Sequence, residues 1–167
     1  TFSYVGQNVD AHPDLARAVV AAGNEVFDHS YTHPHLTTLD DASVRNEVTK
    51  AQAAIFDATG FTPRWFWLPY FESNGQVLAD ISAEGLQCFP YAQFNPRMTN
   101  DWDSSTTAAM VYQTATTGIA DRTVILCHEW PDTTMSELPA IFAELKRQGC
   151  VFVTASELYS LTIAPDV

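Results

Sequence analysis

The sequence is poor in basic residues. Its 167 residues include 8 Lys and Arg against 20 Asp and Glu, which gives a formal net charge of −12. A chain with this charge repels the phosphate backbone of nucleic acids and the anionic headgroups of membranes. We therefore expect no nucleic-acid partner and no membrane partner, whereas a neutral or cationic polymer is compatible with the charge.

Long apolar runs are missing as well. None approaches the roughly 20 residues of a membrane helix, and the chain opens on Thr1 without a signal peptide. Three cysteines, Cys88, Cys127 and Cys150, allow at most one internal disulfide and do not decide the compartment. A charged fraction of 17% beside an aromatic fraction of 12% excludes disorder. This composition favours one rigid, secreted domain over residues 1–167.

Short β-rich runs alternate with helical patterns along the chain. We expect strands at residues 1–5, 25–28, 65–68, 86–89, 123–127 and 151–154. We expect helices at residues 10–23, 41–58, 74–84, 106–116, 136–148 and 156–161. This alternation predicts an α/β fold with a parallel sheet and outer helices, in which chemistry gathers at the carboxyl ends of the strands.

Three of the five histidines follow the predicted strand at residues 25–28. His29 and His33 stand four residues apart, and His35 comes two residues later. Imidazole nitrogens bind zinc and similar divalent ions, so the spacing favours a metal site. The alternative is a polar loop whose histidines satisfy backbone groups, and His35 fits a simple surface position.

His128 directly follows the apolar strand predicted at residues 123–127. Its position suits a general acid or base, a metal ligand or a buried structural histidine. Asp101 lies in the polar loop after the fourth predicted strand and could hydrogen-bond His128 and hold it protonated. The alternative for Asp101 is a carboxylate at a helix N-terminus.

Large aromatic residues collect near the strand ends. Some of them belong in the core, but two or three exposed rings there would form a stacking surface for sugars. Both readings stay open for the set: Trp65, Phe66, Trp67, Tyr70, Phe71, Trp102 and Trp130.

Four segments carry a resemblance to a known family. HSYTHPHL (29–36) is similar to a metal motif H-S/T-x-x-H, and WLPYFESN (67–74) to a stretch R-P-P-Y-G-E-T-N. NDWDSST (100–106) resembles a D-W segment, and ILCHEWPDT (125–133) an L-x-H motif. On these motifs the chain resembles the polysaccharide deacetylases of carbohydrate esterase family 4, the NodB-homology domain. The acetylxylan esterase and chitin-oligosaccharide deacetylase branch is the most similar.

The resemblance implies a deformed (β/α) barrel and hydrolysis of N- or O-acetyl groups on xylan, chitin or peptidoglycan. It implies a divalent metal, usually zinc, with His29 and His33 as ligands. His128 would be the general acid, supported by Asp101. The remaining implied contacts are the backbone N–H of Tyr70 at the oxyanion, Leu126 lining the acetyl pocket and Trp102 walling the site.

Two departures from the family pattern concern catalysis. The family opens with a strand ending in D-D-G, which carries the catalytic base and the metal-binding Asp, and no D-D-G occurs here. The Arg that orients this base is replaced by Trp67, and the Gly after the Tyr by Phe71. We therefore expect a barrel that lacks its first strand, in an N-terminally truncated domain with a weakly held metal.

Two functions from different classes remain open at this point. The chain is either a metal-dependent deacetylase or a degenerate relative that binds carbohydrate without cleaving it, with Trp67 as a stacking ring. The missing strand also leaves an open sheet edge, which we expect to be covered by a terminus or by a second copy of the chain.

Overall fold

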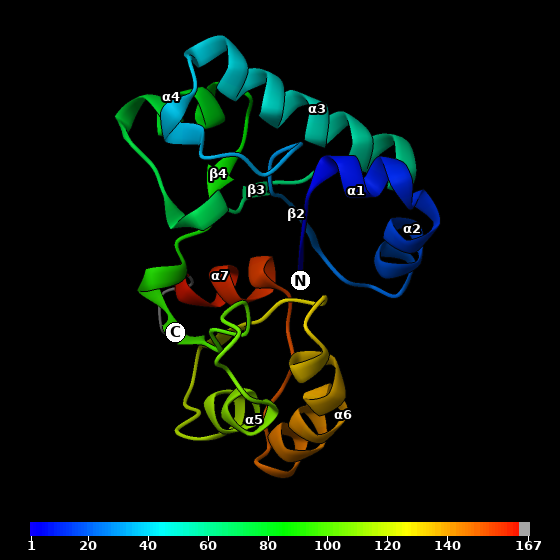
Figure 1. Cartoon of the computed structure of the whole chain (residues 1–167), viewed down its shortest axis with the longest axis vertical. Coiled ribbons are helices and arrows are strands. Elements are labelled where there is room, and N and C mark those ends of the chain that lie inside the picture. The colour runs from blue at the N-terminus through cyan, green and yellow to red at the C-terminus, as the bar shows by residue number, and fades with distance from the viewer. Residues whose placement is uncertain (164–167) are drawn as a thin grey trace. The chain divides into compact units, whose positions relative to one another are not determined.

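The computed structural model describes residues 1–163, with the backbone alone for residues 162 and 163. Its contacts gather in two compact units (Figure 1). The first comprises residues 1–89 and the C-terminal helix, and the second comprises residues 90–153. No helix in the described part of the chain is long and apolar enough to cross a membrane.

The first unit is built on a parallel sheet. Its described strands follow the order β1 (Phe2–Tyr4), β2 (Val26–Asp28), β3 (Trp65–Phe66) and β4 (Gln87–Cys88), and all neighbouring pairs are parallel. Its helices are α1 (Gly6–Ala11), α2 (Pro13–Ala21), α3 (Asp41–Thr59), α4 (Gly75–Ala83) and α7 (Ala155–Ile163). The 3₁₀ turns are η1 (Leu36–Thr38) and η2 (Pro69–Phe71). The parallel sheet and the βα alternation of this unit confirm the sequence prediction.

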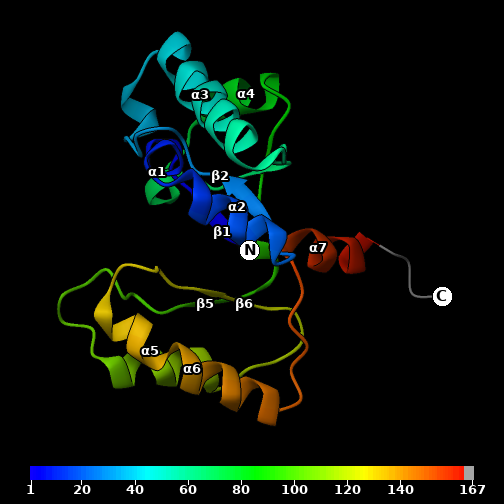
Figure 2. The same cartoon turned by 90° about the vertical axis from the view of Figure 1, so that its right-hand side faces the viewer.

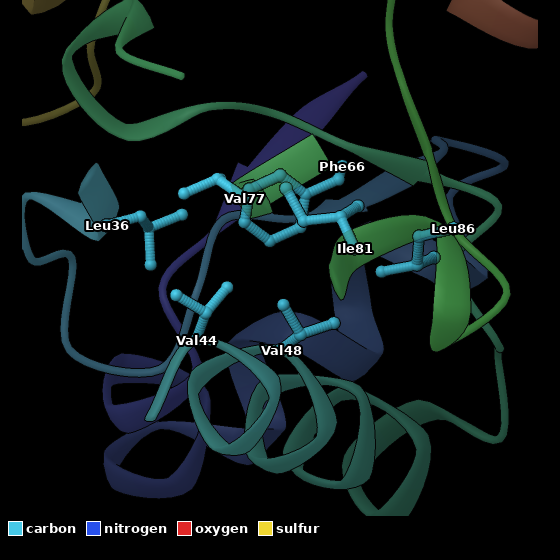
Figure 3. Packing of buried hydrophobic residues seen from close by; sticks show 7 residues of the cluster. All are labelled: Leu36, Val44, Val48, Phe66, Val77, Ile81 and Leu86. Atoms are coloured by element: carbon cyan, nitrogen blue, oxygen red, sulfur yellow. The ribbon is translucent and has the colours of Figure 1, made fainter. Parts of the chain in front are cut away.

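Helix α3 provides the main packing face of this unit. Its apolar side chains Val44, Val48, Ala51 and Ile55 recur at spacings of three and four residues, and all four are buried. The first two pack with residues of β3, α4 and their loops in one cluster: Leu36, Val44, Val48, Phe66, Val77, Ile81 and Leu86 (Figure 3). Asp40 caps the helix by accepting the N–H of Ser43. This core holds Phe66 at the carboxyl end of β3, and Phe66 pairs with Asp28 at the carboxyl end of β2. The candidate site residues of this unit follow these two strand ends.

The second unit pairs β5 (Asn95–Met98) with β6 (Thr123–Leu126) in parallel. Helices α5 (Ala108–Thr116) and α6 (Asp132–Arg147) pack together beside these strands (Figure 2). A short turn η3 (Tyr91–Gln93) precedes β5. A buried cluster joins the two helices: Val111, Ala115, Ile141 and Leu145. The sequence analysis missed β5, because Asn95 and Pro96 are residue types that strands disfavour.

The predicted strand at residues 151–154 is wrong. Val151, Phe152 and Val153 are exposed, and the backbone there has no strand assignment. Thr154 instead caps the start of α7: its N–H donates to the Glu157 carboxylate, and the N–H of Glu157 donates to Thr154 Oγ1. This reciprocal pair is a capping box, whose T-x-x-E signature outweighs the β-branched run before it.

Helix α7 is fastened to the first unit through Ser156. The Ser156 N–H donates to Glu25 at 2.9 Å, and its hydroxyl accepts the indole N–H of Trp65 at 2.8 Å. The Ser156 hydroxyl also hydrogen-bonds Glu25. The Trp65 ring packs edge-on against Tyr159. These contacts link the C-terminal helix to β3 and to the start of β2.

Candidate active site

The histidine loop after β2 is shaped by two carboxylates. Asp28 accepts the N–H of Ser30, and Glu47 on α3 accepts the N–H groups of Tyr31 and Thr32. Ser30 and His33 both have left-handed backbone conformations, with φ of 62° and 59°. The carboxylates thus stabilise a tight loop that returns His33 towards His29.

His29 and His33 meet as the sequence spacing predicts. Their ring centroids are 4.6 Å apart, with the planes nearly perpendicular. His29 Nδ1 lies 2.7 Å from the carbonyl oxygen of Trp67, so it carries the proton and Nε2 keeps the lone pair that binds metals. Because the acceptor is a backbone carbonyl, this contact does not depend on the side chain at position 67.

Tyr70 joins this pair from the loop after β3. Its ring lies 4.7 Å from that of His33, and the ring of His35 stacks on it at 4.0 Å. His35 Nδ1 hydrogen-bonds Glu72 at 2.9 Å, which ties the histidine loop to turn η2. His35 therefore has a defined contact, beyond the surface position that the sequence suggested.

Asp28 stands beside His29 but does not join His29 and His33 in a metal-binding group. Its carboxylate is fully buried, and burial raises its pKa well above the ordinary value, with the nearby charge of Glu47 adding to the effect. Within residues 1–163 there is no group of three or more His, Cys, Asp and Glu side chains that could hold a metal. His29 and His33 therefore fit as two imidazole ligands, short of the three protein ligands of a catalytic zinc site.

His128 and Asp101 meet in the second unit, beyond β6 and β5. His128 Nδ1 lies 2.8 Å from Asp101 Oδ1, and the His128 backbone N–H donates to Oδ2 at 2.7 Å. The hydroxyl of Thr134 donates to the same Oδ2 at 2.6 Å. Asp101 is 4% exposed, whereas the His128 side chain is 36% exposed. The structure thus confirms the predicted contact and excludes a mere helix-capping role for Asp101.

The ionisation of Asp101 follows from these contacts. Burial by itself would raise the pKa of its carboxyl group. The hydrogen bonds from the His128 N–H, the Thr134 hydroxyl and the His128 ring outweigh burial, so the pKa of Asp101 lies below its ordinary value. The sequence analysis did not predict Thr134 as a site residue. Its only signal in the sequence is a hydroxyl group in the first turn of the helix that follows His128.

Two exposed indoles flank His128. The ring of Trp102 lies 6.0 Å away edge-on, and that of Trp130 lies 5.7 Å away at a tilt. Leu126 ends β6, and its carbonyl oxygen accepts hydrogen bonds from both the N–H and the hydroxyl of Thr99. Trp102 thus lies beside the histidine, but its role as a site wall and the acetyl-lining role of Leu126 both stay predictions.

The predicted site residues thus form two groups, one in each unit. His29, His33, Trp67 and Tyr70 come together in the first unit. Asp101, Trp102 and His128 come together in the second, with Leu126 two residues before His128.

Comparison with known proteins identifies the family. The polysaccharide deacetylase family model matches residues 1–89, which include the histidine loop and turn η2. The bifunctional xylanase/deacetylase of Pseudobutyrivibrio xylanivorans is 33% identical over the whole chain, which covers 27% of that protein. The chain belongs to the polysaccharide deacetylase family.

Solved structures of deacetylase relatives share this fold. The family 4 carbohydrate esterase of Streptomyces lividans, in complex with acetate, is 33% identical with a TM-score of 0.76. That alignment covers 86% of this chain and 72% of the esterase. A CE4 family pseudoenzyme of Bacillus anthracis is 26% identical with a TM-score of 0.81, over 94% of this chain and 54% of the pseudoenzyme. The family fold confirms the predicted partial (β/α) barrel, and the family includes members with and without activity.

The chain spans about a third or less of the length of the first curated deacetylases that it matches. It spans 27% of the xylanase/deacetylase and 32% of a peptidoglycan-N-acetylglucosamine deacetylase from Listeria monocytogenes, to which it is 35% identical. These relatives therefore do not by themselves establish the substrate, activity or partners of the whole protein.

Proposed function

We propose that this chain removes acetyl groups, N- or O-linked, from a polysaccharide such as xylan, chitin or peptidoglycan, in a metal-dependent reaction. The observation that carries the proposal is the pair of hydrogen bonds between His128 and the buried carboxylate of Asp101. A structural histidine would not need a half-exposed ring set against a carboxylate that accepts three hydrogen bonds. A general acid does, because its ring must be oriented on one side and reachable on the other.

The hydrogen bond to Asp101 determines which nitrogen of the His128 ring transfers a proton. Because Asp101 accepts from Nδ1, that nitrogen keeps its proton, and Nε2 is the atom that gives a proton to the departing sugar oxygen or nitrogen. The ionised Asp101 stabilises the positive ring before this transfer. Thr134 and the His128 N–H hold the carboxylate in place without donating to the substrate.

In the first unit, His29 and His33 are the residues that would hold a divalent ion, zinc being one candidate. Such an ion, when bound, polarises an acetyl carbonyl as a Lewis acid. The contact between His29 and the Trp67 carbonyl orients the first ligand, and Tyr70 packs against the second. We propose the backbone N–H of Tyr70 as an oxyanion donor and Leu126 and Trp102 as substrate contacts.

The test is acetate release from acetylated xylan and from chitin oligomers, with Zn²⁺ or Co²⁺ supplied. The parent protein should release acetate, and His128→Ala should abolish release without loss of metal. An equal fall of metal content in the His128 variant would show that His128 is a ligand and would refute the assigned roles.

A second function, carbohydrate binding without hydrolysis, is favoured by two specific observations. Trp67 stands where the family has the Arg that orients its catalytic base, and the described residues supply only two metal ligands. A parent protein that binds oligosaccharides but releases no acetate with metal present would select this function. Trp67→Ala should then weaken binding more than His128→Ala does.

A further inference from the structure

A row of aromatic rings runs from the core of the first unit to its surface. Phe27 on β2 is 2% exposed and packs against Trp67 at 6.4 Å between ring centroids. Trp67 stacks on Phe89 at 6.2 Å and meets Phe71 edge-on at 5.4 Å. Phe71 is 45% exposed, the most exposed of the four rings. The buried rings therefore hold Trp67, and Trp67 orients Phe71.

The backbone at Phe71 is costly for a residue with a side chain. Phe71 has φ of 57° and follows Tyr70, which has φ of 56°. Two consecutive residues other than glycine in the left-handed region are unfavourable, and glycine would avoid the cost at either position. A large apolar ring that is both strained and exposed contributes little to folding. The presence of such a ring at this position therefore points to a role in binding.

Both rings occupy positions where the chain departs from the family motif. Trp67 replaces an Arg and Phe71 replaces a Gly, and the two replacements touch each other. The pair also lies next to the histidine loop, because the Trp67 carbonyl accepts the hydrogen bond from His29. An exposed, pre-oriented aromatic ring pays little conformational entropy on binding, which suits a flat and partly apolar ligand.

We propose that Phe71, supported by Trp67, is a stacking site for one sugar ring of the polysaccharide, beside the unit that carries the acetyl group. A pyranose ring presents an apolar C–H face that fits an aromatic surface, and the net charge of −12 selects neutral or cationic chains over acidic ones. This inference rests on the proposed function for its ligand class, but it requires binding only and not turnover.

The experiment measures binding of xylohexaose and chitohexaose by calorimetry to the parent and three variants. Phe71→Gly removes the ring and relieves the backbone strain. Phe71→Tyr keeps an aromatic face, and Phe56→Ala removes an equally exposed ring on α3, 53% exposed, as the matched control. Phe71→Gly should bind one of the oligosaccharides about tenfold more weakly, with a melting temperature equal to or above that of the parent. Phe71→Tyr and Phe56→Ala should bind as the parent does.

Three binding results would overturn the stacking site. They are unchanged binding in Phe71→Gly, an equal loss in Phe56→Ala, or a parent that binds neither oligosaccharide. A marked fall in the melting temperature of Phe71→Gly would also do so, since it would make the ring a structural one. Acetate release separates the two proposals: a parent without turnover that binds through Phe71 refutes the deacetylase proposal and keeps the stacking site.

Discussion

The carboxylate of Asp101 holds His128 at two points, the ring Nδ1 and the backbone N–H of the same residue. The carboxylate thereby fixes both the ring and the loop that carries it. A ring held only through Nδ1 could swing with its backbone. The double contact is therefore the feature that makes His128 a positioned group at the end of β6.

Asp101→Asn should lower the free energy of unfolding by about 2–3 kcal/mol at pH 7. Three donors converge on the two carboxylate oxygens, and the amide replaces one of these acceptors with an NH₂ group that cannot accept a hydrogen bond. The folded-state pKa of Asp101 lies below its ordinary 3.8. The stabilisation of the folded protein by ionised Asp101 is therefore complete at pH values above 3.8 and is lost as the pH falls through the folded-state pKa.

Urea unfolding at pH 7 and pH 3 checks this prediction, with exposed Asp57→Asn as the control. The parent should lose more stability than Asp101→Asn on going to pH 3, while Asp57→Asn follows the parent. Equal pH sensitivity of Asp101→Asn and the parent would contradict it.

Gly6→Ala should destabilise the histidine loop. A Cβ at this position would lie 2.7 Å from Cδ2 of Tyr31 and 2.8 Å from the Cα of Ala51, and the helix backbone cannot retreat. We expect a loss of about 1–3 kcal/mol, together with weaker metal binding, since Tyr31 lies between the two candidate ligands. Gly75→Ala is the control, because its Cβ would meet no atom within 4 Å. Thermal melts that give equal stability for both variants would refute this account.

The metal ligands are tested by single alanine substitutions in one loop. His29→Ala and His33→Ala should each abolish binding of Zn²⁺ or Co²⁺, as measured by elemental analysis after equilibrium dialysis against a fixed concentration of the free ion. His35→Ala should retain the ion, because His35 bonds to Glu72. Since two imidazoles hold an ion weakly, a chelator should strip the parent rapidly. Full metal content in His29→Ala would exclude the proposed pair.

Cys88 and Cys127 should react slowly with iodoacetamide in the folded protein. Burial raises the pKa of each thiol from 9.0 to about 11. At pH 8 only about one thiol in a thousand is then ionised. Mass spectrometry should show both as unmodified until the protein is unfolded. Alkylation of both at the rate of free cysteine would contradict this prediction.

Most strands and helices of the first unit could be predicted because each carries its own signal. The exception is the single helix expected at residues 10–23, which the structure replaces with two helices, α1 (Gly6–Ala11) and α2 (Pro13–Ala21). Helix α3 has an N-cap, an apolar spacing of three and four residues and a terminal glycine, and its structure matches to within one residue. Residues 151–154 could not be predicted in this way. A β-branched run forms a strand only when a partner strand pairs with it. The capping box at Thr154 stabilises a helix through local contacts and needs no partner strand.

The sequence predicted which residues belong to the candidate site better than it predicted the contacts between them. The spacing of His29 and His33 and the motif around His128 gave the chemistry. Sequence reasoning could not find Thr134, which reaches Asp101 only because α6 begins at Asp132, four residues earlier than its apolar pattern indicates. Nor could it find the contact between Trp67 and Phe71, which depends on the left-handed backbone of η2.

The central claim is that this chain hydrolyses acetyl groups with His128 as the acid, and acetate release tests it most directly. Acetylated xylan and chitin oligomers are incubated with the parent and with His128→Ala, each with Zn²⁺ or Co²⁺ supplied, and free acetate is measured alongside bound metal. The account predicts acetate from the parent, none from His128→Ala, and equal metal content in both. Absence of acetate from the parent, or equal release by His128→Ala, would contradict it.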